Sequence, residues 1–205
     1  MAKIRQLFWL YGLSDFIFYR TFVFENNTIQ MEFRKADFSE LDSIMKIVHQ
    51  AQDFLKKLNI NQWQNGYPTR EIVSQDIENG NAYLLTDDKK VMAVVTVLFS
   101  KEPTYDVIYE GKWLTEGEYS VVHRLAVDSQ FKKKGIATSV LEEIDTMTLQ
   151  KGIHSIKVDT HEDNIPMQKL LQKNGFVYCG VIYLLDGNKR IAFEKILQDN
   201  YQFLH

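Results

Sequence analysis

The sequence has little cysteine and proline, no long apolar run and no marked excess of charge of either sign. Its one cysteine, Cys179, excludes an internal disulfide, and no Cys/His spacing typical of a zinc site occurs. A net charge of −3 over 205 residues provides no basic footprint for nucleic acid. These absences favour a compact cytoplasmic protein with neither a metal nor nucleic acid as partner.

The N-terminal stretch is rich in aromatic residues, but its apolar run is broken by Gly12, Ser14 and Asp15. No small-residue cleavage site follows, so we expect neither a signal peptide nor a membrane span. We divide the chain into residues 1–30, an extension that docks on the core or mediates homodimerisation, and residues 31–205, one domain. A hydrophobic content of 45% suffices for a single core in that domain.

The stretch EYSVVHRLAVDSQFKKKGIATSVL, residues 118–141, reads as a buried strand, a basic loop and the start of an amphipathic helix. The loop carries three lysines and ends in Gly135, and Ala137 follows in the first helical turn. A helix N-terminus presents unpaired N–H groups and partial positive charge, and small residues allow a ligand to approach the backbone. The stretch therefore predicts a pyrophosphate cradle; the alternative is that the lysines form an ordinary solvated face.

The remaining pattern predicts alternating helices and strands. Apolar spacing indicates one helix over 39–58, and Thr69 caps a second helix that ends near Gly80. Asn164 begins a later helix, with Pro166 just inside it, and Asn174-Gly175 ends it. Strands or hairpins are expected at 81–86, 90–99, 118–127, 154–160, 176–184 and 190–196.

Two separated motifs resemble those of the GNAT superfamily of N-acetyltransferases. The first is L-x-V, a turn, and then K-x-x-G-x-A, with Lys132 where the family has Gln or Arg and with Gly135 and Ala137 in register. The second is formed by Asn164, Met167, Leu170, Gly175 and Phe176. Together with the elements between them, they extend the resemblance over roughly residues 31–197.

The resemblance implies an α/β (α+β) GNAT fold. Such a fold has a mixed, mostly antiparallel central sheet of six to seven strands with flanking helices, and a V-shaped splay between two parallel strands, here 118–127 and 154–160. Acetyl-CoA lies in that opening as cosubstrate. The resemblance and the cradle together give these cofactor-binding residues: Leu125, Ala126, Val127, Lys132, Lys133, Lys134, Gly135, Ile136, Ala137, Thr138 and Asn164. Trp63 and Tyr67 are expected to line the acceptor pocket, or alternatively only to pack their loop onto the domain.

The implied activity is that of an acyl-CoA N-acyltransferase that moves an acetyl group to a primary amine of a small molecule or peptide. The amine attacks the thioester directly in a ternary complex, so a base is needed, and His123 and Glu118 are the candidates. A hydrogen-bonded strand histidine is the alternative for His123. The family's usual acid, a tyrosine, is replaced by Leu171, so either Tyr178, Tyr183 or water takes that role, or no acid is required. That replacement keeps open a non-catalytic acyl-CoA-binding sensor or assembly module.

Overall fold

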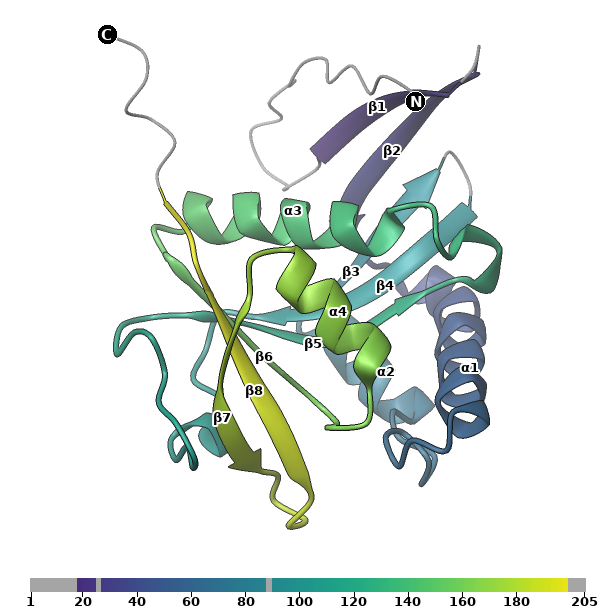
Figure 1. The fold of residues 1–205 in the computed structure, drawn as a ribbon. Helices are drawn as coiled ribbons and strands as arrows, with labels where there is room; N and C mark the ends of the chain where they lie inside the picture. The colour runs from purple at the N-terminus through teal and green to yellow at the C-terminus, as the bar shows by residue number, and fades with distance from the viewer. Residues whose placement is uncertain (1–17, 25–26, 88–89, 199–205) are drawn as a thin grey trace, which may run out of the picture. The chain divides into compact units, whose positions relative to one another are not determined.

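A computed structural model describes residues 18–24, 27–87 and 90–198. Its helices are α1 (Leu41–Lys57), α2 (Arg70–Glu78), α3 (Ile136–Gln150) and α4 (Ile165–Lys173), and short 3-10 turns lie at η1 (Phe38–Glu40), η2 (Pro103–Tyr105) and η3 (Ser129–Phe131). Its strands are β1 (Phe18–Phe24), β2 (Asn27–Lys35), β3 (Ala82–Asp87), β4 (Lys90–Leu98), β5 (Ser120–Val127), β6 (Ser155–Thr160), β7 (Val177–Tyr183) and β8 (Lys189–Ile196). Figure 1 shows their arrangement. No helix within the described ranges is long and apolar enough to cross a membrane.

The strands form a mixed sheet in the order β1-β2-β3-β4-β5-β6-β8-β7. The pairs β1–β2, β2–β3, β3–β4, β6–β8 and β7–β8 are antiparallel, while β5 and β6 are parallel. The predicted fold class, a mostly antiparallel sheet with flanking helices, is confirmed. The described part has eight strands rather than six or seven, because residues 18–24 pair with β2.

The expected extension over residues 1–30 therefore includes backbone that belongs to the sheet. The strand β2 runs from Asn27 to Lys35 and passes through the predicted boundary at residues 30 and 31. Residues 1–17 lie outside the described residues, and the expected role of the extension in docking or dimerisation stays a prediction.

The parallel ladder between β5 and β6 contains two residue pairs, Ser120 with Ile156 and Val121 with Lys157. Both pairs lie at the N-terminal ends of the strands. A splay between two parallel strands requires their ladder to end early in this way. The strand β5 begins at Ser120 rather than at Glu118, so Glu118 lies just before it.

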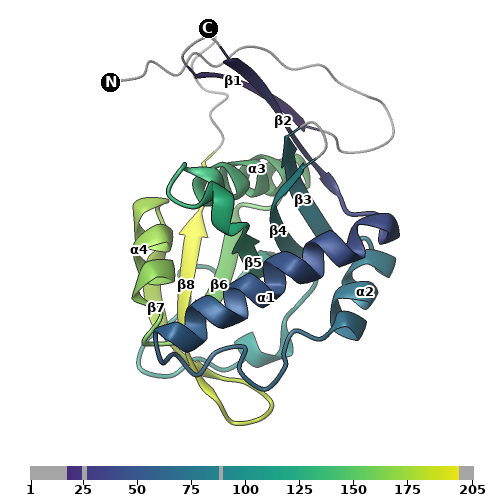
Figure 2. The ribbon, with the colours of Figure 1, turned by 90° about the vertical axis from the view of Figure 1, so that its right-hand side faces the viewer.

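The chain divides into two compact units. The first consists of residues 1–53, 65–96 and 124–143, and in it α1 crosses in front of β3 and β4 with α2 beside its N-terminal end (Figure 2). Apolar residues recur at helical spacing on α1, so one face of the helix is buried against the strands. The largest fully buried side chains of this unit are Phe33, Ile44, Ile47, Leu84, Leu85, Met92 and Leu141.

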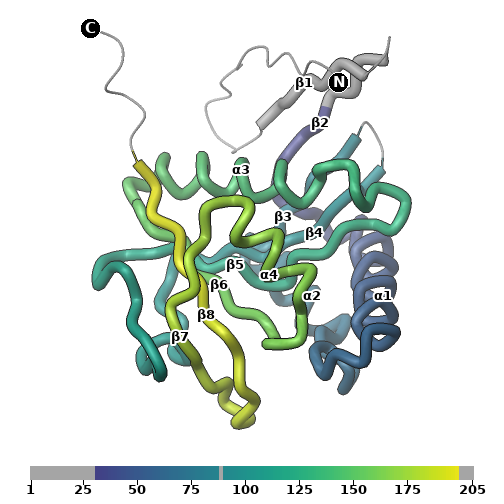
Figure 3. Tube along the Cα trace, viewed as in Figure 1, coloured from purple at the N-terminus to yellow at the C-terminus, as the bar shows by residue number. Residues whose placement is uncertain are grey.

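The second unit consists of residues 54–64, 97–123 and 144–205. In it the connection from β4 to β5, residues 99–119, lies along β7 (Figure 3), where Tyr109 and Val181 exchange backbone hydrogen bonds of 2.7 Å. A Cβ on Gly111 would lie 2.0 Å from the Cys179 carbonyl oxygen, and one on Gly180 would lie 2.5 Å from that of Tyr109. Glycine at both positions therefore permits the connection to pack against the strand.

Candidate active site

The loop of residues 128–135 joins β5 to α3 and contains most of the predicted pyrophosphate cradle, and it is called the donor-binding loop after that prediction. The side chain of Gln50 on α1 holds it in place. The Ser129 N–H donates to Gln50 Oε1 at 2.7 Å, and Gln50 Nε2 donates to Asp128 Oδ2 at 3.3 Å. Asp128 in turn accepts from the Gln130 N–H at 2.8 Å, and its own N–H donates to the Met92 carbonyl at 2.9 Å. These bonds fix the path of the chain immediately before α3.

The end of the loop presents the N-terminus of α3. Gly135 has a φ of +83°, and an added Cβ would meet no atom within 4 Å, so the backbone is open on that side. The first hydrogen bond within the helix is donated by the Ser139 N–H to the Gly135 carbonyl at 3.0 Å. The N–H groups of Ile136 and Ala137 therefore precede the ladder, as expected at a helix start. Lys133 and Lys134 are exposed beside it, so the loop can receive an anionic group.

Arg124 is a residue that sequence reasoning missed. Its φ of +53° interrupts the extended backbone of β5 just before Leu125. Its side chain pairs with Asp76 of α2 through two 2.7 Å bonds, and Nη1 donates to the Tyr67 hydroxyl at 2.6 Å. Thr96 completes the group by donating to Asp76 at 3.0 Å. An arginine within the apolar run VVHRLAV was the available signal, because a buried guanidinium needs a carboxylate partner.

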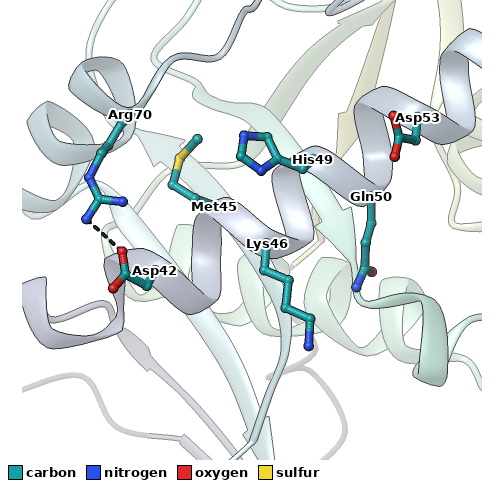
Figure 4. Close-up of a pocket in the computed structure, with 7 residues that line it drawn as sticks. All are labelled: Asp42, Met45, Lys46, His49, Gln50, Asp53 and Arg70. Carbon is teal, nitrogen blue, oxygen red and sulfur yellow. Dashed lines mark ion pairs between the residues drawn. The ribbon is translucent and has the colours of Figure 1, made fainter.

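A shallow pocket of about 480 Å³ lies along the outer side of α1 in the first unit (Figure 4). Its lining includes an exposed ion pair, in which Arg70 Nη2 lies 2.7 Å from Asp42 Oδ1. Gln50 belongs to the lining and also contacts the donor-binding loop. The pocket contains none of the predicted site residues. It is lined by Asp42, Met45, Lys46, His49, Gln50, Asp53 and Arg70.

The two candidate bases differ sharply in their surroundings. His123 lies on β5 in the second unit, where its Nε2 is 3.2 Å from Glu102 Oε2 and its side chain is 19% exposed. The hydrogen bond with His123 lowers the pKa of Glu102 to about 2. Glu118 is exposed and precedes the strand. The structure thus gives His123 a fixed acidic partner, which the sequence did not reveal.

Aromatic residues pack beside the pair of His123 and Glu102. Tyr105 is buried, its ring centroid is 6.4 Å from that of His123, and its hydroxyl donates to Asp159 Oδ1 at 2.8 Å. Burial raises the pKa of Tyr105 well above its usual value. Trp113 donates to the Tyr105 carbonyl at 2.9 Å, and Lys157 Nζ lies 4.4 Å from the Trp113 ring centroid. These contacts pack the part of the connection between β4 and β5 around Tyr105 and Trp113 against neighbouring strands, while most of its other residues are exposed.

In the second motif, the structure has the helix start that the sequence predicts. Asn164 caps α4 by accepting from the Met167 N–H at 3.2 Å, and its Nδ2 donates to Gln62 Oε1 at 2.9 Å. The side chain is buried, so its first role is to join the helix start to the segment after α1. Leu171 is 1% exposed and packs in the core. Its apolar side chain cannot donate a proton.

The remaining candidate acids, Tyr178 and Tyr183, and the single cysteine lie on the same strand, β7. Tyr178 and Tyr183 are about half exposed and pack edge-on against Phe193 and Tyr109 respectively. Cys179 is buried, and burial raises the pKa of its thiol to about 11, so it is unsuited to act as a nucleophile at neutral pH.

The two predicted acceptor residues fall in different units. Trp63 is partly buried with a φ of +63° in the second unit, whereas Tyr67 belongs to the first unit and is 39% exposed. The hydroxyl of Tyr67 accepts from Arg124, and its carbonyl accepts from Gln52 Nε2 at 2.9 Å. Tyr67 therefore has a defined polar environment.

Comparison with known proteins agrees with this geometry. A model of the acetyltransferase (GNAT) family matches residues 48–176. A GNAT-family acetyltransferase structure from Streptococcus agalactiae is 36% identical, with a TM-score of 0.76, and the match covers 82% of this chain and 96% of that one. A protein of Bacillus subtilis named as an uncharacterized N-acetyltransferase, YesJ, is 25% identical over 183 residues, which is 85% of this chain and 96% of the relative.

A more distant GNAT-family structure, from Listeria monocytogenes, has the same fold at 16% identity, with a TM-score of 0.65 and coverage of 86% of this chain and 99% of that one. The family model matches well over half of the chain and includes both β5 and the donor-binding loop. The protein is thus a transferase, and it belongs to the GNAT family of acetyltransferases.

Proposed function

We propose that this protein transfers an acetyl group from acetyl-CoA to a primary amine of a small molecule or peptide, by direct attack in a ternary complex. The observation that carries the proposal is the donor-binding loop. Its path is fixed by Gln50, and it ends in an open backbone at Gly135, beside exposed lysines and the start of a 15-residue helix. Backbone N–H groups and lysine charge are suited to the pyrophosphate of CoA.

The backbone of β5 supplies the second element of the proposal. Arg124 breaks the extended geometry immediately before Leu125, so the strand is irregular where the family pattern expects the acyl group. A prepositioned backbone N–H stabilises an oxyanion as it develops, and we assign this role to Leu125. The network of Arg124 with Asp76, Thr96 and Tyr67 holds the irregular backbone in place.

The chemistry requires a neutral amine. Its lone pair forms a bond to the thioester carbon, the C–S bond breaks, and the electron pair leaves on the CoA sulfur. We assign His123 as the base that takes the proton of the amine, because it carries a fixed carboxylate partner and is partly exposed. The acid that returns a proton to the thiolate is Tyr178, Tyr183 or water, since Leu171 is buried and apolar.

The same buried Leu171 favours one other function, a module that binds acyl-CoA without transferring the acyl group. The two functions share the donor-binding loop and differ in the chemical step. They are separated by whether free CoA appears when the protein is mixed with acetyl-CoA and amines.

The first test is thermal melting with excess acetyl-CoA and with ATP as control. A ligand at 100 times its Kd adds about 2.7 kcal/mol to the free energy of unfolding, which is roughly 5–10 °C for a chain of this size. We expect that shift with acetyl-CoA and none with ATP. Equal melting temperatures with and without acetyl-CoA would contradict the proposal. Binding without release of CoA across an amine panel would favour the non-catalytic module.

A further inference from the structure

The carboxylate of Glu102 contacts His123 in a defined orientation, because its two oxygens have different partners. Glu102 caps η2, and its Oε1 accepts from the Thr104 N–H at 3.3 Å and from Thr104 Oγ1 at 2.9 Å. Its Oε2 faces His123 Nε2 at 3.2 Å. The backbone N–H of Glu102 donates to the Tyr119 hydroxyl at 3.2 Å. The carboxylate is thus held at one oxygen and offered to the imidazole at the other.

The protonation of Glu102 determines which ring nitrogen of His123 carries the proton. The hydrogen bond with His123 keeps the pKa of Glu102 at about 2, so the group is a carboxylate at neutral pH. An ionised carboxylate only accepts hydrogen bonds, so Nε2 must be the donor. A neutral imidazole then has its lone pair at Nδ1.

We propose that Glu102 is a positioning residue for His123: it fixes the Nε2–H tautomer and leaves Nδ1 as the atom that receives the proton of the attacking amine. This inference rests on the proposed acetyl transfer. In that step the amine nitrogen bonds to the acetyl carbon, the electron pair of the C–S bond leaves on sulfur, and the amine proton passes to Nδ1. The resulting imidazolium is stabilised by the carboxylate at Nε2.

The groups packed around the pair are compatible with this role. Tyr105 presents its ring to His123 and has its hydroxyl engaged by Asp159, whose Oδ2 lies 3.9 Å from Arg190 Nε. The hydroxyl of Tyr119 accepts from the Glu102 N–H. Burial, and then the nearby charge of Asp106, raise the pKa of Tyr119. Among these neighbours Glu102 is the carboxylate in direct contact with the imidazole. Removal of its charge should therefore weaken both the preference for the Nε2–H tautomer and the stabilisation of the imidazolium.

The experiment compares the full-length wild-type protein with Glu102→Gln, Thr104→Val and His123→Gln, and with Glu116→Gln as control. Glu116 is an exposed carboxylate on the same connection, so it matches the charge change without touching the pair. Imidazole nitrogen NMR reports the tautomer of each histidine, and His123→Gln identifies the signal among the five histidines. Release of CoA against pH reports the acid limb of kcat/KM.

We expect wild type and Glu116→Gln to show the Nε2–H tautomer for His123. In Glu102→Gln the signal should show a mixed tautomer, and the acid limb of kcat/KM should move down by about 1 pH unit. Loss of the base in His123→Gln should lower kcat by about 10²- to 10⁴-fold at an unchanged KM for acetyl-CoA. Thr104→Val, which loosens Glu102 without removing its charge, should give a smaller change in the same direction.

Different results overturn different statements. An Nδ1–H tautomer in the wild type, or a tautomer and acid limb unchanged in Glu102→Gln, would contradict the positioning role even if acetyl transfer is observed. Wild-type rates in His123→Gln would contradict the assignment of His123 as the base, and with it the role of Glu102. The proposed acetyl transfer would remain supported. A wild type that neither binds acetyl-CoA nor releases CoA would refute the proposed function itself, whatever the NMR signals show.

Discussion

Two Arg–Asp pairs in this chain have the same separation but very different surroundings. Arg124 and Asp76 are 2.7 Å apart, with side chains 14% and 12% exposed, whereas Arg70 and Asp42 are 2.7 Å apart with side chains 51% and 87% exposed. A buried charge that loses its partner stays desolvated, while an exposed one is solvated by water. The same substitution at the two sites should therefore have unequal effects.

We expect Asp76→Ala to lower the free energy of unfolding by about 3–5 kcal/mol, because it leaves the largely buried side chain of Arg124 without its carboxylate. For this chain length the melting temperature should fall by about 6–20 °C. Asp42→Ala should change stability by no more than about 0.5 kcal/mol. Thermal melts of both variants, side by side, test this. Equal shifts would mean that the Arg124 group contributes no more than a surface pair.

At the scale of elements, the connection between β4 and β5 owes its conformation to contacts with β5, β7 and β8. Its buried aromatic residue Tyr105 belongs to a cluster with Val121, Ile182 and Ala192. Glu194, which is fully buried, accepts from the Leu114 N–H at 2.5 Å and from Ser155 Oγ at 2.7 Å. These contacts hold the segment that carries Glu102.

Gly111 is the glycine of this connection at which an added side chain would clash with the backbone of β7. A Cβ there would lie 2.0 Å from the Cys179 carbonyl oxygen, whereas one at Gly117 would meet nothing within 4 Å. We expect Gly111→Ala to displace the connection from β7 and to destabilise the protein by about 1–3 kcal/mol, as overpacking does. Gly117→Ala, on the same connection, serves as the control and should remain near wild type.

Limited proteolysis provides the readout for this segment. In Gly111→Ala, cleavage within residues 99–119 should accelerate relative to wild type, and in Gly117→Ala it should not. Because the connection carries Glu102, Gly111→Ala should also weaken the pairing with His123. Equal proteolysis and melting for both variants would show that the close approach at Gly111 does not hold the connection in place.

At the scale of the whole molecule, the carboxylate of Glu102 makes the free energy of unfolding depend on pH. The ordinary pKa of Glu102 is 4.5, and its hydrogen bond with His123 lowers the folded-state pKa to about 2. A carboxyl whose pKa is lower in the folded state stabilises the fold above its unfolded pKa and loses that contribution as the pH falls through its folded pKa. The contribution of Glu102 should therefore be present above pH 4.5 and disappear between 4.5 and about 2.

The measurement is a series of melts between pH 2.5 and 7 for wild type and Glu102→Gln. The difference in stability between the two proteins should be largest near neutral pH and should shrink as the pH falls below about 4.5. A difference independent of pH would show that Glu102 contributes through packing or hydrogen bonding alone, without its charge.

The sequence alone determined the four helices and six of the eight strands of the described part, in their order; β1 lies within the stretch that was assigned to an extension, and β2 crosses its boundary. Thr69 and Asn164 cap the helices that they were expected to cap, and Leu171 packs in the core as its spacing indicates. The two motifs also identified the family. These features depend on neighbours a few residues away, which periodicity and capping chemistry describe directly. The predicted roles of individual site residues in binding or catalysis stay predictions.

The tertiary structure decided which charged and polar side chains meet. Gln50 lies 79 residues from Ser129, Asp76 lies 48 residues from Arg124, and Glu102 lies 21 residues from His123. An apolar stripe specifies that a face is buried, but not which polar group on a distant segment will satisfy a buried charge. Those pairings arise only when the segments pack together, because an unpartnered polar group in the interior is costly.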